Sequence, residues 1–168
     1  MPVDDPRQEL QRLKALQETG LLTARAPPEF QDMCGRAHTQ FRATMVLVKV
    51  VTEDKIIVKA QIGTDIQEMP RHDAFSNHTI RSDDVFVVHD AAKDERFASH
   101  LLVTQYAIVF YAGAPLIYRR EVRLGSFCLL DTKPREFSLG DRAELALMAD
   151  ELVSVLIRQD MDRSWRLH

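Results

Sequence analysis

The sequence predicts an α+β fold, in which helices at both ends of the chain enclose a run of antiparallel strands. Three observations support this prediction. Residues 5–41 place apolar side chains at the period of helices, residues 44–131 hold several β-branched apolar segments, and residues 138–160 return to a helical period. No internal repeat, low-complexity stretch or long linker interrupts the chain. We therefore expect one domain spanning residues 1–168.

The composition is that of an ordinary globular protein. Of 168 residues, 45% are hydrophobic and 28% are charged, and 22 Lys plus Arg against 25 Asp plus Glu give a formal charge of −3. This balance gives no reason to expect nucleic acid or a membrane as a partner. The start lacks the apolar core of a signal peptide, and Cys34 and Cys128 are too few for a disulfide framework, so we expect a cytoplasmic protein with reduced thiols.

Two helices are predicted in the first 41 residues. Asp5 can cap the first helix, Pro6 fits its first position, and Gly20 ends it. Pro27 and Pro28 introduce the second helix. Its apolar residues fall on one helical face: Phe30, Met33, Cys34, Ala37 and Phe41.

The middle of the chain predicts a sheet of five to six strands. Residues 44–62 have the pattern of a hairpin, and 85–88 form a short strand. Residues 107–118 and 122–131 are longer strands with apolar residues on both faces, so each side of the sheet must be covered. Pro115 favours a bulge or an unpaired edge.

A capping box of Ser138 and Asp141 predicts the start of the last helix, which we expect to run to about Asp160. Two adjacent apolar rows follow it: Leu145, Met148, Leu152 and Val155, then Ala146, Ala149, Val153 and Leu156. The second row exceeds what one core-facing stripe needs and suggests a homodimer. One wide stripe against the sheet would also use both rows.

Residues 72–80, HDAFSNHTI, contain the residue types of a hydrolase or a zinc site. Ser76 has no neighbouring glycine to form a nucleophile elbow, so Ser76 or Asp73 more readily caps a short helix. His72 and His78 are six residues apart, which places them on different helical faces. We expect neither a catalytic serine nor a bound metal.

The cysteines and one arginine allow further interpretations. Cys34 lies on the apolar helical stripe and Cys128 alternates in phase with apolar strand residues, which favours buried thiols over reactive ones. Arg96 beside Phe97 could bind a carboxylate or a phosphate. Alternatively, Arg96 ties its own loop together through Asp90 or Asp94.

Several segments together resemble the GAF domain, in the bacterial branch where it stands alone or precedes a histidine kinase or diguanylate cyclase. They are LQETGLLTARAPPEFQDMCGRA, AFSNHTI, VHDAAKDERFAS, IVFYAGAPL and LGSFCLLDTKPREFS. The resemblance covers about residues 5–160 and is most specific over 110–138. It implies an antiparallel sheet with the terminal helices on one face, while loops and short helices over the other face enclose a pocket.

The resemblance implies that residues 72–80 belong to this cap. The residues expected to face its pocket are Ser76, His78, Arg96, Phe97, Phe110, Ala112 and Cys128. Neither cysteine is followed by histidine, so a covalent tetrapyrrole is not expected, and no other cofactor is implied. The pattern of cyclic-nucleotide-binding relatives is not recognisable.

The function implied is a non-enzymatic sensory module, in which an unidentified small molecule shifts the terminal helices and signals to a kinase or cyclase. Two alternatives remain open. One is a thiol-dependent methionine-sulfoxide reductase acting through Cys128, although such relatives use loop cysteines. The other is a ligandless interaction domain, for which a filled, dry cap is expected.

Overall fold

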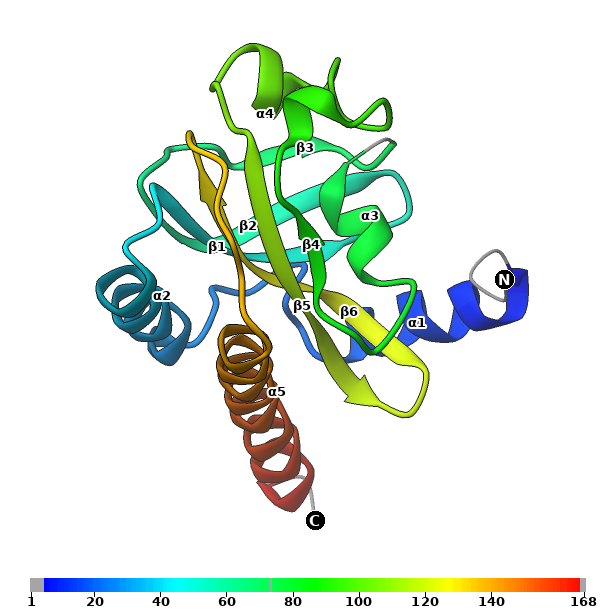
Figure 1. Ribbon diagram of the computed structural model, residues 1–168. Coiled ribbons are helices and arrows are strands. Elements are labelled where there is room, and N and C mark those ends of the chain that lie inside the picture. Colours follow the sequence, from blue (N-terminus) through cyan, green and yellow to red (C-terminus); the bar gives the residue numbers. More distant parts are fainter. Residues whose placement is uncertain (1–4, 73, 167–168) are drawn as a thin grey trace.

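The computed structural model describes residues 5–72 and 74–166 and centres on one six-stranded antiparallel sheet (Figure 1). The strand order is β3-β2-β1-β6-β5-β4. The strands are β1 (Met45–Val51), β2 (Lys55–Ile62), β3 (Glu68–Pro70), β4 (Phe86–Val88), β5 (Phe110–Arg119) and β6 (Val122–Asp131). The predicted α+β class with an antiparallel sheet is confirmed.

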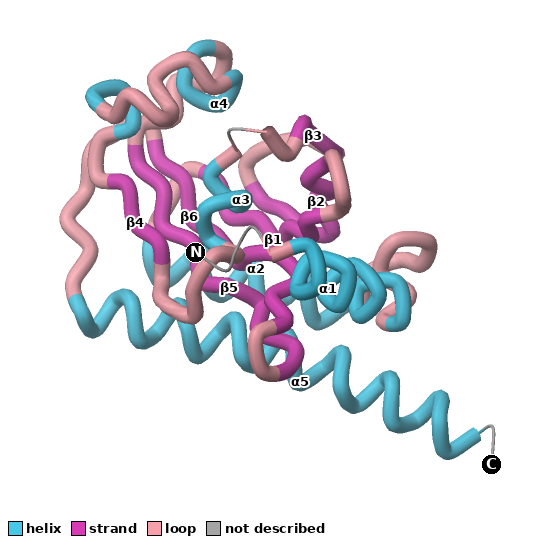
Figure 2. The backbone as a smooth tube through the Cα atoms, turned by 90° about the vertical axis from the view of Figure 1, so that its right-hand side faces the viewer, coloured by secondary structure: helices cyan, strands magenta, loops and turns pink. Residues whose placement is uncertain are grey.

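The sheet is the middle of three layers. Helices α1 (Pro6–Glu18), α2 (Pro28–Phe41) and α5 (Leu139–Arg166) share a hydrophobic core with one face of the sheet. The other face carries α3 (Phe75–Thr79), the 3-10 helix η2 (Ala91–Lys93), α4 (Leu101–Thr104) and their loops. We call residues 71–106 the cap. Figure 2 shows α5 along one side of the sheet and α4 beyond its other end.

The two N-terminal helices form where their sequence signals lie. The Asp5 carboxylate accepts a hydrogen bond from the Arg7 amide at 2.9 Å, and Gly20 adopts a φ of 77° after the end of α1. All five residues of the predicted apolar stripe of α2 are buried. These helices therefore follow from capping and periodicity.

Side chains of the central strands alternate between the two cores. Phe110, Ala112 and Ala114 of β5 face the helices, whereas Tyr111 faces the cap. The pairing of β5 with β6 shifts register between Pro115 and Ile117 of β5, where the sequence predicted an irregularity. The two cores lie on opposite sides of one sheet.

The last helix begins as predicted and ends later. Ser138 and Asp141 exchange two hydrogen bonds of 3.0 Å, which form the capping box. The helix continues to Arg166 rather than Asp160, and its last turns extend past the rest of the chain (Figure 2). Among the described residues, no helix combines the length and apolar character needed to cross a membrane.

Helix α5 has no surplus apolar row among the residues that the sequence predicted for one. Both predicted rows face the sheet and α2, and seven of their eight residues are buried. The exposed apolar residues of α5 form a different set: Leu139, Leu147, Ile157, Met161 and Trp165.

Gly113 leaves the space in which the Tyr111 ring lies along β5. A Cβ atom at residue 113 would overlap the Tyr111 hydroxyl and its ring carbons. Tyr111 is fully buried and hydrogen-bonded, so its ring cannot move aside cheaply. Glycine is required here by a close approach rather than by an unusual φ.

We expect Gly113→Ala to lower the free energy of unfolding by about 1–3 kcal/mol, the range for an overpacked core. The matched control is Gly140→Ala in the exposed first turn of α5, where the added methyl meets no close neighbour. Gly140→Ala should leave stability unchanged or raise it by up to about 1 kcal/mol. Urea unfolding of both variants measures the difference, and equal stabilities would contradict the packing argument.

Candidate functional site

Aromatic rings fill the space between the cap and the sheet. Phe75 of α3 lies between two rings, with centroids 4.6 Å from Tyr111 and 4.4 Å from Phe97. All three side chains are fully buried. His78 stacks on Phe86 at 5.6 Å and meets the edge of Phe97 at 5.0 Å. We call these five residues the ring stack.

The expected cap is present. The expectation of an enclosed pocket beneath it is wrong, because stacked and fully buried rings fill this space. Clefts of the described residues open to the surface, and one of them is lined by residues 87–90 and 93–96 of the cap. Another of about 40 Å³ lies between α1, α3 and the β5–β6 hairpin, and a third of about 370 Å³ lies between α2 and α5. A ligand could enter under the cap only if the ring stack moved.

A polar cluster lies on the sheet beside the ring stack. Its members are Lys49, Ser76, Thr79, Tyr111 and Ser126, all buried. The hydroxyls of Ser76 and Ser126 are 2.9 Å apart, and those of Thr79 and Tyr111 are 2.7 Å apart. The Tyr111 hydroxyl also donates to Ser126 at 3.4 Å. Four hydroxyls from α3, β5 and β6 therefore form one connected network.

Lys49 brings the only charge of this polar cluster. Its residue is fully buried in β1, beside Ser126 of β6, and its Nζ lies 5.6 Å from the centre of the Tyr111 ring. Among the described residues, no ion pair includes Lys49, which hydrogen-bonds to the Cys128 thiol, and no buried side-chain nitrogen or oxygen lacks a hydrogen-bond partner. The cluster is thus internally satisfied in the closed cap, without a carboxylate.

Burial controls the acidity of the nearby tyrosine and thiols. It raises the pKa of Tyr111 and of the Cys128 thiol, and the neighbouring Lys49 ammonium and hydrogen bonds offset this for Cys128 only in part. Burial also raises the pKa of Cys34 to about 12, on the other side of the sheet. Both thiols are therefore protonated at neutral pH, and a protonated thiol is a poor nucleophile.

The structure brings together five of the expected site residues, because Arg96 lies against the ring of Phe97 and four others lie on the cap side of the sheet. Ser76, His78, Phe97 and Cys128 all lie on the cap side of the sheet. Ser76 is inside α3, not at its N-cap, which is Ala74, so the capping interpretation is wrong for Ser76. Asp73, the alternative cap, lies outside the described residues.

Arg96 ties its own loop together. It forms two hydrogen bonds to the Asp94 carboxylate, at 3.0 and 2.7 Å, and its guanidinium covers the rings of Phe86 and Phe97. The alternative through Asp94 is thus the one observed, while Asp90 pairs with Lys93. Arg96 closes the outer side of the ring stack.

Phe110 and Ala112 were expected to face the pocket and do not. Both belong to the core that packs against the helices. Cys128 pairs with Gly113 across the sheet, so the β5 residues on its face are Tyr111 and Gly113. The expectation was wrong because it placed Phe110 and Ala112, instead of Tyr111 and Gly113, on the cap side of β5.

Sequence reasoning missed Lys49, Thr79, Tyr111 and Ser126. A signal existed for Lys49, because a lysine within the apolar run TMVLVKVV has to be buried if both faces of the strand are covered.

Within the described residues, no group of three or more His, Cys, Asp or Glu side chains is placed to hold a metal ion.

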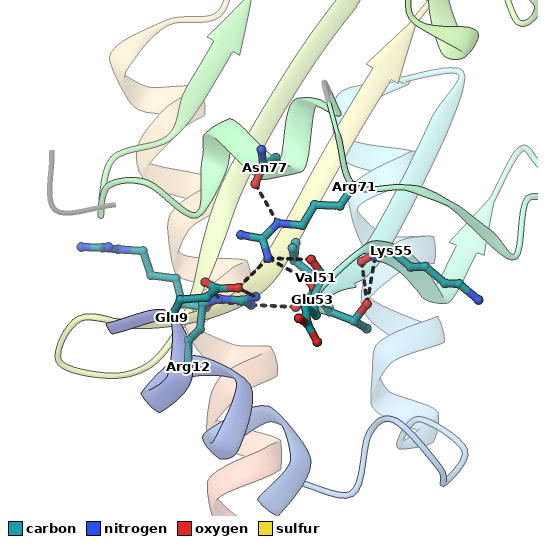
Figure 3. A network of polar contacts seen from close by, with 9 residues as sticks. Glu9, Arg12, Val51, Glu53, Lys55, Arg71 and Asn77 are labelled. Atoms are coloured by element: carbon teal, nitrogen blue, oxygen red, sulfur yellow. Dashed lines mark hydrogen bonds and ion pairs between the residues drawn. The ribbon is translucent and has the colours of Figure 1, made fainter. Parts of the chain in front are cut away.

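A second polar network joins α1 to the cap (Figure 3). Glu9 accepts hydrogen bonds from both Arg12 and Arg71. Arg12 also donates to the Val51 carbonyl at 2.7 Å, and Arg71 donates to Asn77 of α3 at 2.9 Å. Partial burial would raise the pKa of Glu9, but the hydrogen bonds from the two arginines outweigh it and lower the pKa to about 2.

Comparison with known proteins agrees with this architecture. The family model of the GAF domain matches residues 14–157. The cyclic di-GMP phosphodiesterase PA2567 of Pseudomonas aeruginosa is 34% identical over 131 residues, or 77% of this chain and 22% of that protein. The chain therefore spans about a fifth of the length of this curated relative.

Two solved structures share the fold at low identity. The type II free methionine-R-sulfoxide reductase from Thermoplasma acidophilum has a TM-score of 0.65 at 18% identity, covering 76% of this chain and 89% of its own. The GAF domain from an Acinetobacter phosphoenolpyruvate-protein phosphotransferase has a TM-score of 0.67 at 13% identity, covering 93% and 97%. With its three layers, its cap and the family match over most of its length, the chain belongs to the GAF domain family.

Proposed function

We propose that this GAF domain is a non-enzymatic small-molecule sensor whose recognition groups are the polar cluster under the cap. The observation that carries this proposal is the full burial of Lys49 beside the Tyr111 ring and the Cys128 thiol, with no described carboxylate paired to it. The ligand is unidentified. The chemistry of the cluster suits a small molecule with an anionic group for Lys49 and polar groups for the hydroxyls.

Burying the ammonium group of Lys49 costs free energy. Charges taken out of water are expensive, and replacing buried ionic groups by apolar residues of similar volume is often neutral or stabilising. A methionine would fill the same space beside Tyr111 and Cys128 without this cost. The presence of a lysine therefore supports a role in recognition rather than in stability.

Binding requires a second arrangement of the cap. Because the ring stack fills the interior, a ligand has to bind a state in which Phe75 and Phe97 have moved, and its affinity for that state shifts the population. The output is a change in the terminal helices. Similarity to part of a cyclic di-GMP phosphodiesterase supports a signalling role, and we propose a kinase or a cyclic-di-GMP enzyme as the partner.

A ligandless interaction domain is the second candidate. The filled, fully buried interior of the cap favours it, since a packed core needs no guest to be stable. The two candidates differ in whether a small molecule is bound at Lys49 in the purified protein.

We also propose that two copies associate through α5. Residues 157–166 are exposed, and they include the apolar side chains of Ile157, Met161 and Trp165. A projecting helical segment of this length is marginal by itself in water, and apolar contacts with the same segment of a second copy would stabilise it.

The sensor proposal predicts a bound small molecule that depends on Lys49. Native mass spectrometry of freshly purified protein should show a non-covalent adduct, which is lost in Lys49→Met. The control is Lys55→Met, which removes an exposed lysine from the neighbouring strand and should keep the adduct. Wild-type protein without an adduct, together with a Lys49→Met variant of higher stability, would favour the ligandless domain.

The thiols are expected to react slowly in the folded protein. Both are buried with raised pKa values, so alkylation by iodoacetamide should be at least about tenfold slower in buffer than in urea. Methionine-sulfoxide reduction with a thiol donor should be absent. Turnover that disappears in Cys128→Ser would instead establish the reductase alternative.

The dimer proposal predicts a concentration-dependent mass in sedimentation equilibrium. Met161→Glu should shift the protein to monomer, because it places a charge in the apolar stripe of the projecting turns. Leu139→Glu, an exposed residue at the opposite end of α5, is the control and should sediment as wild type. A wild-type monomer at high micromolar concentration rules out this association.

A further inference from the structure

Helix α1 is held to the sheet by few contacts. Its buried residues are Arg12, Ala15 and Leu16, and Leu10 on the same helix is 68% exposed. An element with so little buried apolar surface belongs to the least stable part of a fold. Small changes in its polar contacts can therefore change how often α1 detaches.

Arg12 provides the polar contacts that join α1 to the end of β1. Its guanidinium forms two hydrogen bonds of 2.9 Å to Glu9 and one of 2.7 Å to the Val51 carbonyl. Arg12 thus fixes Glu9 on the helix and fixes the helix on the end of β1. Arg12 also donates to the carbonyl of Arg123 at 3.4 Å, and the side chain of Arg123 donates to Asp83 and to the carbonyl of Ile80 in the cap.

Arg71 connects this part to the cap. It lies directly after β3, where its Nη1 donates to Glu9 and to the carbonyl of Thr52 at 3.0 Å. Its Nε donates to the Asn77 side chain of α3 at 2.9 Å. One guanidinium therefore bridges α1, the β1–β2 turn and α3, as Figure 3 shows.

We infer that Arg71 is a positioning residue that transmits movement of the cap to α1. The same five-residue helix α3 carries Asn77, held by Arg71, and Phe75 and His78 of the ring stack. Displacing the ring stack moves α3, which pulls Arg71 away from Glu9 and leaves α1 with its apolar patch and its contacts through Arg12, Arg119 and Arg163. This inference deepens the proposed sensor function, because it names the route from the cap to a terminal helix.

The coupling can be tested without the ligand, by loosening the cap with Phe97→Ala. Phe97 stacks on Phe75, so its removal frees α3 but touches none of the polar contacts of α1. Hydrogen exchange measured by mass spectrometry should show faster exchange in α3 and in α1. Helix α2, which packs on the same core as α1, should be unchanged. If Phe97→Ala does not fold, Phe97→Leu is the milder alternative.

The decisive comparison is a double-mutant cycle with Arg71→Met. In wild-type background, Phe97→Ala should lower the protection of α1 by about fivefold or more, the lower end of coupling between sites. In the Arg71→Met background, the same change should still loosen α3 but no longer alter α1. Arg36→Met, which removes an exposed pair with Glu151, is the matched control and should leave the coupling intact.

Two outcomes would overturn the inference. One is an equal loss of α1 protection with and without Arg71, and the other is a loosened α3 that leaves α1 unchanged in the wild-type background. Neither depends on whether Lys49 binds a small molecule, so failure here and failure of the sensor proposal are separate results.

Discussion

Strands β1, β5 and β6 form a sheet with no face in water. Every residue of β1 is buried, and so are most residues of the other two strands. Such a sheet is stable only if both faces are covered, and the chain provides helices for one face and the cap for the other. A charged side chain in the middle of β1 then has no path to solvent. The burial of Lys49 is thus a consequence of the layering.

The cap combines two kinds of interaction with different demands. The ring stack gains from close packing and tolerates small sliding movements, whereas the hydroxyl network depends on distances near 3 Å and on direction. Tyr111 belongs to both, because its ring stacks on Phe75 and its hydroxyl contacts Thr79 and Ser126. Moving the ring stack therefore also changes the hydrogen bonding around Lys49, which couples the apolar and polar parts of the interior.

Much of the fold could be predicted from the sequence, because helical periods, capping residues and β-branched runs are local signals. The phase of β5 could not. Alternate residues of this strand are apolar on both faces, so nothing in the sequence shows whether Phe110 or Tyr111 shares a face with Cys128. Only the pairing of Cys128 with Gly113 decides it. The contact between Glu9 and Arg71 joins residues 62 positions apart and leaves no trace in local pattern.

The sheet ends in a three-residue strand at each edge, β3 on one side and β4 on the other. Edges this short offer few backbone N–H and C=O groups to another chain, and Pro70 removes one donor from β3. Strand β3 pairs only with residues 55–57 of β2 and strand β4 only with residues 111–113 of β5, so a peptide that paired with β3 or β4 would form few backbone hydrogen bonds. At these two short strands, recognition of another chain would therefore depend on side-chain contacts more than on backbone pairing.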